Sequence, residues 1–402
     1  MIKILQINTV SNSGSTGRIA EGIAQTIKLN NWESFIAYGR HKNPSYYSKE
    51  ILVGDRWDFY THVLGTRLTD GHGLYSKNAT VNLLSQISEL EPDLIHLHNI
   101  HGYYLNIKML FDYIKKHNIP VVWTLHDCWA FTGHCSHYSH VNCNLWKTQC
   151  NHCPQTSRYP KSYIDFSKRN YNYKKELFNN IKHLTIVTPS EWLANEVKDS
   201  FLGEYSRQVI NNGIDLQKFL YRENSDMWKH YKIQNQKVIL GVASIWDDRK
   251  GFEDFIRLNK QISNLDFQIV MVGLSQKQLK NLPKGIIGIA RTENIEQLAE
   301  LYSLADIFFN PTYEDNFPTT NIEALACGTP VITYNTGGSP EIIDQNTGWV
   351  VQPGDLLAVK NILSSLNDKD SYKLYCRKRA ETFYSDKVRF QDYIEIYKKY
   401  LD

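Results

Sequence analysis

The sequence predicts an α/β protein built from two doubly wound domains, and three observations support this. Its 402 residues exceed what a single hydrophobic core usually supports. Strand-like apolar runs alternate with helical patterns through both halves, which is typical of βα repeats around a parallel sheet. The apolar runs are continuous and rich in Ile and Val, as strands buried on both faces are.

The predicted strands fall into two groups along the chain. A strand end, a helix and an Asn-Gly turn follow one another closely over residues 188–215, and this predicts the domain break. The first group of strands comprises residues 2–10, 34–38, 93–98, 121–125 and 184–188, and the second comprises 238–243, 267–272, 306–310 and 331–334.

We therefore expect an N-terminal domain over residues 1–187, with a Cys-rich insertion at 128–160, and a C-terminal domain over 188–380. The final segment, 381–402, carries apolar residues at helical spacing and predicts an amphipathic helix. Between 43 and 81 the apolar pattern loses its period. That segment fits either a lid that faces an acceptor or a packed surface excursion.

Composition excludes several classes of protein. A net charge of +3 is small for this length and gives no reason to expect a nucleic-acid partner. No run of eighteen apolar residues occurs, and Met1 opens a strand pattern rather than a signal peptide. We expect a cytoplasmic protein without a membrane span.

An acidic motif in the second half points to chemistry. Asp315 and Glu323 lie eight positions apart, and Glu323 is predicted in the first turn of a short helix. Backbone N–H groups at such a helix start, here Thr319 to Asn321 with Thr320 between them, bind phosphate oxygens, while a carboxylate grips sugar hydroxyls. The sequence thus predicts a nucleotide-sugar site. Thr320 to Glu323 also fits a capping box, a purely structural role.

Two cations follow the strand at 238–243. Arg249 and Lys250 stand between this strand and the next helix, where positive charge would neutralise a diphosphate. Basic residues on a loop are often only solvated, so the position at the strand end carries the prediction.

The first half offers two further candidates. Gly14 and Gly17 lie in the turn after the first strand and would let backbone N–H groups approach a phosphate, although many such glycines serve chain reversal only. His126 ends the strand at 121–125, where ligands of open α/β sheets bind, and Asp127 is available to orient its ring. A histidine held there by backbone alone is the alternative.

Together these residues resemble the retaining glycosyltransferases of family four, which have a B-type fold: two facing Rossmann-like domains with a cleft between them. The resemblance spans essentially the whole chain. Its main carriers are the acidic motif followed by Ala324-Leu-Ala-Cys-Gly-Thr-Pro330, with Leu125-His-Asp127, Lys250-Gly251 and Gly337-Gly-Ser-Pro-Glu341 in support.

The resemblance implies a role for each motif. Glu323 would bind the donor ribose, Asp315 and His126 would lie near the donor sugar, and Lys250 would bind the diphosphate. The implied enzyme is a hexosyltransferase type that moves a sugar from a nucleotide-diphosphate sugar to a hydroxyl of a glycan or lipid-linked acceptor, with retention. It needs no cofactor for the chemistry, and its C-terminal helix packs back on the N-terminal domain.

The chain departs from the family pattern in two places. Asp315 replaces the usual glutamate, and Glu314 stands beside it, so either carboxylate could face the sugar. The arginine that commonly follows the first strand of the C-terminal domain is absent, and Ser244 stands near its position. We hypothesise that Arg249 compensates for the missing arginine.

Five of the seven cysteines fall between Cys128 and Cys153, which in a reducing compartment favours metal binding over disulfides. A structural zinc is one hypothesis, because zinc prefers four thiolate or imidazole ligands in a tetrahedron; free thiols in a reduced loop are the alternative. Similar loops occur in relatives that resemble colanic-acid and capsule glycosyltransferases. The candidate ligands are Cys135, Cys143, Cys150 and Cys153.

We expect surface polysaccharide biosynthesis as the context, with the enzyme in the cytoplasm or at the inner face of the membrane as a peripheral protein. Two other functions remain open at this point. Sugar-nucleotide epimerases share the two-domain architecture. A nucleotide-sugar-binding or scaffold protein would result if the shorter Asp315 and the missing arginine abolished turnover.

Overall fold

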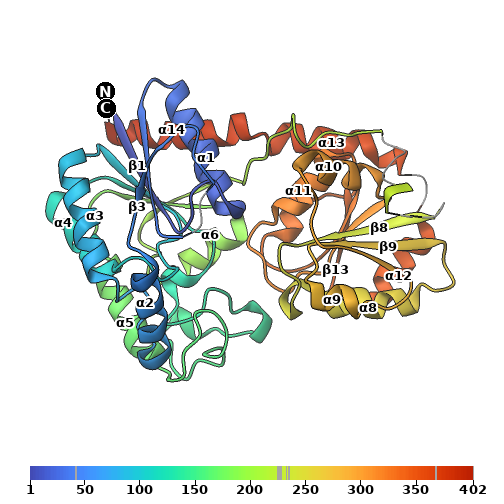
Figure 1. Cartoon of the computed structure of the whole chain (residues 1–402), viewed down its shortest axis with the longest axis horizontal. Helices are drawn as coiled ribbons and strands as arrows, with labels where there is room; N and C mark the ends of the chain where they lie inside the picture. The colour runs from blue at the N-terminus through green and yellow to red at the C-terminus, as the bar shows by residue number, and fades with distance from the viewer. Residues whose placement is uncertain (41–42, 224–228, 232, 234–235, 367–368, 402) are drawn as a thin grey trace. The chain divides into compact units, whose positions relative to one another are not determined.

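The computed structural model describes the whole chain except residues 41–42, 224–228, 232, 234–235, 367–368 and 402, and it divides into two compact units (Figure 1). The first unit contains Met1–Asn211 together with Lys387–Asp402, and the second contains Asn212–Asp386. Each unit is built around one parallel sheet with helices on both faces, so the predicted fold class is confirmed.

The first sheet has the strand order β3-β2-β1-β4-β5-β6-β7, and every neighbouring pair is parallel. The order reverses direction between β1 and β4. The strands are β1 (Lys3–Asn8), β2 (Glu33–Tyr38), β3 (Lys49–Leu52), β4 (Leu94–Leu97), β5 (Val121–Thr124), β6 (Leu184–Thr188) and β7 (Ser206–Val209).

Alternating side chains of these strands enter two separate cores, as period-two strands require. Leu5 and Ile7 of β1 point into the core beneath α3, α4 and α5, whereas Ile4 points to the opposite face, beneath α1 and α14. The helices of this unit are α1 (Gly14–Leu29), α2 (Arg56–Thr69), α3 (Lys77–Leu90), α4 (Ile107–His117), α5 (Ser167–Phe178), α6 (Glu191–Lys198) and α14 (Asp386–Leu401).

The second sheet has the order β10-β9-β8-β11-β12-β13, again all parallel, and reverses between β8 and β11. Its strands are β8 (Lys237–Val242), β9 (Phe267–Val272), β10 (Ile286–Ile289), β11 (Ile307–Asn310), β12 (Val331–Tyr334) and β13 (Gly348–Val351). Its helices are α8 (Phe252–Gln261), α9 (Gln276–Lys280), α10 (Ile295–Leu304), α11 (Thr319–Ala326), α12 (Leu356–Ser365) and α13 (Asp370–Phe383).

The structure differs from the expected organisation in two places. The first unit runs to Asn211 rather than ending at 187, because α6 and β7 complete the first sheet. The segment 43–81, where the apolar pattern loses its period, contains β3 and α2 and the start of α3. No helix among the described residues combines the length and apolarity that crossing a bilayer requires.

The last helix belongs to the first unit. From Lys387 on, α14 lies on the face of the first sheet that α1 also covers, and its Phe390, Ile394 and Tyr397 are buried there against Ile4 and Ile23. The chain therefore returns to its first sheet after completing the second one.

Candidate functional site

The second unit places the predicted cations and carboxylates at its topological switch point. In open α/β sheets, ligands bind at the carboxyl ends of the strands where the order reverses, here β8 and β11. Lys250 lies in a short 3-10 turn after β8, η4 (Asp248–Lys250), which Asp247 caps. Gly251 has φ +71°, and a Cβ at this position would lie 2.3 Å from the Pro311 carbonyl oxygen. Glycine therefore lets the turn after β8 pack on the segment after β11.

This packing joins the two motifs by an ion pair. Lys250 Nζ lies 2.5 Å from Asp315 Oδ2, and each side chain keeps about a fifth of its surface exposed. Arg249 Nη1 donates to the Glu314 carbonyl oxygen at 3.0 Å, and Tyr313 N donates back to the Arg249 carbonyl at 2.8 Å. Glu314 is buried. Asp315 is thus the more accessible of the two adjacent carboxylates.

Glu323 occupies a different position on its helix from the one predicted. Helix α11 begins at Thr319 after Pro318, so Glu323 lies in the second turn rather than the first. The helix has no side-chain cap, and the capping-box interpretation of Thr320 is wrong because Thr320 is itself helical. Glu323 Oε2 instead accepts a hydrogen bond from the Tyr302 hydroxyl at 3.0 Å. Tyr302 lies in α10, and nothing in the sequence linked it to the motif.

The first three residues of α11 differ in their burial and in their contacts. Thr319 and Thr320 are half-buried and are the first two residues of α11, so their backbone N–H groups lie at the N-terminus of the helix. Asn321 is fully buried, and its Oδ1 accepts from Asn310 Nδ2 at 2.7 Å. The Asn321 side chain therefore ties α11 to β11 and does not face outward as a ligand residue would.

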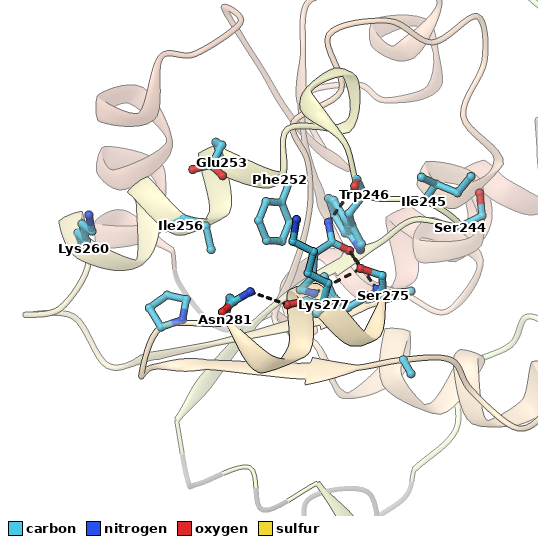
Figure 2. Close-up of a pocket in the computed structure, with 15 residues that line it drawn as sticks. Ser244, Ile245, Trp246, Phe252, Glu253, Ile256, Lys260, Ser275, Lys277 and Asn281 are labelled. Carbon is cyan, nitrogen blue, oxygen red and sulfur yellow. Dashed lines mark hydrogen bonds between the residues drawn. The ribbon is translucent and has the colours of Figure 1, made fainter. Parts of the chain in front are cut away.

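Ser244 follows β8 by two positions. It is exposed and lines a cavity of about 910 Å³ between α8 and α9, which Figure 2 shows with Trp246 and Phe252 beside it. Among the described residues that line this cavity, neither Lys250 nor Asp315 occurs. Ser244 and the Lys250–Asp315 ion pair therefore do not share this cavity.

In the first unit, His126 is held by a chain of side chains that starts inside the core. The Gln6 amide donates to the Ala20 carbonyl oxygen at 2.9 Å, which turns the Gln6 oxygen towards His98 Nε2 at 3.0 Å. His98 Nδ1 in turn lies 3.0 Å from His126 Nε2. All of Gln6 and almost all of His98 are buried.

This chain determines which nitrogens carry protons. Burial holds the pKa of His98 well below its usual range, so its ring is neutral. Because Gln6 presents an oxygen, His98 Nε2 donates and its Nδ1 accepts, and His126 must donate from Nε2. Burial lowers the pKa of His126 to about 4, so this ring is also neutral and its Nδ1 is unprotonated.

Asp127 does not orient His126 as predicted. Its carboxylate lies 2.8 Å from His101 Nε2 and accepts from Trp129 N at 2.9 Å. Burial alone would raise the pKa of Asp127, but the neighbouring His101 and that backbone N–H lower it to about 2. Asp127 is therefore ionised and positions the chain after β5.

The glycines of the first βα turn show local packing. Gly14 opens α1 with φ +63°, and a Cβ on Gly17 would lie 3.2 Å from the backbone nitrogen of Asn12. Gly17 thus has a structural reason of its own, independent of any ligand.

The cysteine cluster gathers around one point. All four predicted ligands line a single small cavity of about 10 Å³, and Gly133 N donates to Cys150 Sγ at 3.2 Å. In the part of the chain that the structure describes, however, no three His, Cys, Asp or Glu side chains are placed so that they could hold an ion together. The four residues are Cys135, Cys143, Cys150 and Cys153.

In sequence, the chain matches two glycosyltransferase family models and is similar to curated glycosyltransferases. The model named Glycosyltransferase Family 4 matches residues 35–218, and the model named Glycosyl transferases group 1 matches residues 236–368. A putative colanic acid biosynthesis glycosyl transferase from Escherichia coli, WcaC, is 26% identical over 76% of this chain and 76% of its own length. The capsular polysaccharide biosynthesis glycosyltransferase CapM from Staphylococcus aureus is 26% identical over 54% of this chain and 62% of its own.

Solved structures agree on the fold. Sucrose-phosphate synthase from Thermosynechococcus elongatus superposes with a TM-score of 0.74 over 99% of both chains, at 17% identity. Anabaena HepE, solved in complex with UDP-glucose, gives a TM-score of 0.68 over 99% of this chain and 100% of its own, at 14% identity. The chain therefore belongs to the glycosyltransferases that carry a family 4 domain followed by a group 1 domain, and it has their B-type fold.

Proposed function

We propose that this glycosyltransferase moves a hexose, with retention, from a nucleoside-diphosphate sugar to a hydroxyl of a glycan or lipid-linked acceptor in surface polysaccharide synthesis. The Lys250–Asp315 pair at the switch point of the second sheet is the observation that carries the proposal. The relatives named for colanic acid and capsular polysaccharide support the pathway, and HepE, which was solved with UDP-glucose, supports the donor class.

The pair suggests how the donor is received. A diphosphate carries more negative charge than one carboxylate, so it would compete for Lys250 and release Asp315 towards the sugar hydroxyls. As the glycosidic bond breaks, negative charge grows on the departing phosphate, and a fixed cation stabilises that charge. Glu323, held by Tyr302, would accept hydrogen bonds from the ribose. His126 would bind the sugar through its unprotonated Nδ1.

A panel of nucleotide sugars screened by thermal shift tests this proposal, since a ligand that binds only the folded state raises Tm. Lys250→Met should weaken binding of the active donor about 10- to 100-fold, the range expected for losing a charge-assisted contact. Lys260→Met, which removes a cation from the cavity between α8 and α9, is the matched control and should bind normally. Equal donor affinity in Lys250→Met and the parent would contradict the proposal.

Arg249 has a role of its own in this proposal. Ser244 stands near the position of the absent arginine, whereas Arg249 lies five residues further on, and its side chain already holds the loop that carries Asp315. We expect Arg249→Ala to weaken donor binding, and Arg249→Lys to recover the charge but not the contact with the Glu314 carbonyl oxygen. Unchanged donor affinity in Arg249→Ala would refute the compensating role.

We also propose that the four clustered cysteines bind a structural zinc. They already share one cavity, so their thiolates would need to turn towards one point within it. Metal analysis of protein purified without chelator should find about one zinc per chain, and Cys150→Ser with Cys153→Ser should lose it. Metal-free protein with an unchanged Tm after chelation would remove the zinc. The chemistry of transfer is proposed to need no metal.

A further inference from the structure

Helix α2 exposes a row of large apolar side chains. Trp57, Tyr60, Leu64 and Leu68 are between 51% and 77% exposed. Their spacing of three, four and four residues places them within about 80° of one another around the helix, on a single face. We call these four side chains the α2 stripe. Contiguous exposed apolar surface of this kind marks an interaction site.

The opposite face of α2 is firmly packed. His62 and Thr66 are fully buried, and His62 accepts from Gly73 N at 3.0 Å while its other ring nitrogen lies 2.8 Å from the Ser76 hydroxyl. Asp55 caps the helix in a capping box. The stripe is therefore presented by a rigid element, and its exposure does not result from a loose helix.

A neighbouring loop extends the stripe. Tyr163 N donates to the Arg67 carbonyl oxygen at 2.8 Å, so this loop lies at the C-terminal end of α2. Tyr163 and Ile164 are themselves 66% and 45% exposed. Lys161 lies over the Tyr163 ring, 5.8 Å from its centroid. Exposed aromatic, aliphatic and cationic side chains thus lie at the C-terminal end of α2.

The charges around the stripe select the partner. Arg56, Arg67 and Lys161 are all exposed beside it, while Asp58 and the N-cap residue Asp55 hold each other at the start of α2 in the capping box. Asp165, which follows Ile164, is exposed, and its carboxylate oxygens accept hydrogen bonds from Cys153 N and Ser167 N. Trp and Tyr prefer the membrane interface, and Lys and Arg attract anionic headgroups.

A second copy of the chain fits this surface less well. A two-fold contact would pair the patch with itself and bring the same cations together, because such interfaces are self-complementary. Anionic lipid headgroups, in contrast, neutralise the cations while the acyl region receives the apolar side chains.

We propose that the α2 stripe, with Tyr163 and Ile164, inserts into the interface of an anionic membrane and docks the first unit there. Helix α2 is labelled in Figure 1. This deepens the proposed function by placing the enzyme on the membrane that would hold a lipid-linked acceptor. Binding to lipid can be measured without donor or acceptor, so its failure is separate from a failure of the proposed function.

Co-sedimentation with phosphatidylcholine vesicles, with and without phosphatidylglycerol, tests the docking. We expect the parent protein to bind the anionic vesicles. The variant Trp57→Ser/Leu64→Ser/Leu68→Ser should bind at least about tenfold more weakly. Full burial of even one of these side chains in the membrane contributes about the free energy that corresponds to a tenfold change in affinity. Arg67→Gln with Lys161→Gln should weaken binding to the anionic vesicles only.

The matched control removes equally exposed apolar side chains from α12 and α13 of the second unit: Leu357→Ser/Leu374→Ser/Tyr375→Ser. It should bind vesicles as the parent does. All substitutions are at exposed positions, and an unchanged Tm verifies that each variant folds. Parent protein that binds neither vesicle, or a control that loses binding equally, would overturn the proposal. So would a dimer that the α2 variant abolishes, since the stripe would then be a contact between copies.

Discussion

At the residue scale, the side-chain amide of Gln6 determines which ring nitrogens of His98 and His126 carry protons. A histidine in a buried strand is usually only packed, and His96 of β4 fits that description, since it is fully buried between Thr124 and Tyr397. His98 differs because the Gln6 amide group donates to Ala20, so the Gln6 oxygen faces His98 and acts there as a hydrogen-bond acceptor. The tautomer of His126 is thus set from the core, two side chains away.

Replacing His98 should change His126 before it changes the fold. In His98→Leu the Nε2 proton of His126 loses its acceptor, so we expect mixed tautomers and transfer slowed about tenfold, the loss of roughly one oriented hydrogen bond. His98→Asn, whose side-chain oxygen stands near the place of Nδ1, should restore much of both.

Nitrogen NMR of the histidine rings reads the tautomer directly, and transfer rates are measured beside it. A His98→Leu protein in which His126 keeps its Nε2 proton and full rate would show that the ring is held by other contacts. Equal loss in the Leu and Asn variants, with a lowered Tm in both, would indicate a packing role instead.

At the element scale, the sequence predicted the strands that lie inside each sheet and missed those at the edges. The nine predicted strands became β1, β2, β4, β5 and β6 of the first sheet and β8, β9, β11 and β12 of the second. The four missed strands, β3, β7, β10 and β13, are the two edges of each sheet. The edge strands β3 and β7 are partly exposed and carry charged or polar residues, so they lack the continuous apolar run that marks a strand buried on both faces. The edge strands β10 and β13 are runs of only four residues that each contain a glycine, which weakens the strand signal.

The site shows the same limit. Lys250, Asp315 and Glu323 were identified because they belong to local motifs at strand ends and a helix start. Tyr302 and His98 were missed as site residues, because their roles depend on contacts with residues 21 and 28 positions away, which no local pattern reports.

The turn after β12 supports the acidic motif through backbone contact. Gly337 has φ +54°, and a Cβ there would lie 1.8 Å from the Asp315 carbonyl oxygen. Gly337→Ala should therefore displace Asp315 from Lys250 and reduce transfer by at least about tenfold. Gly354→Ala is the control, because Gly354 has φ +80° but the atom nearest to its added Cβ, the Tyr313 hydroxyl oxygen, would lie at an ordinary distance of 3.4 Å.

Transfer rate and Tm measured together separate strain from function. Both variants should lose about 1 kcal/mol of stability from the positive φ alone, and only Gly337→Ala should also lose activity. If the two variants keep the same activity, the Gly337 backbone does not position the motif.

At the scale of the whole molecule, titratable groups are divided unevenly. Thirteen of the fourteen histidines belong to the first unit, and the remaining one is His230. Burial lowers the pKa of His62 to about 3 and of His126 to about 4, and holds the pKa of His72, His96 and His98 well below the usual range. The folded first unit therefore keeps five rings neutral that the unfolded chain would protonate.

This difference makes the first unit acid-labile. Below pH 6.5 these five histidines are protonated in the unfolded chain but stay neutral in the folded first unit. The histidines therefore leave the folding stability unaffected above pH 6.5 and lower it as the pH decreases towards their pKa values in the folded state. Each such ring contributes up to about 1.4 kcal/mol per pH unit, while carboxylates of ordinary pKa scarcely titrate between pH 6.5 and 5.5. The second unit should change little in this window.

Hydrogen exchange read by mass spectrometry, corrected for its intrinsic pH dependence, should show protection falling in β4 and β5 but not in β11 and β12. Equal losses in both units would mean that the histidines do not govern the acid response.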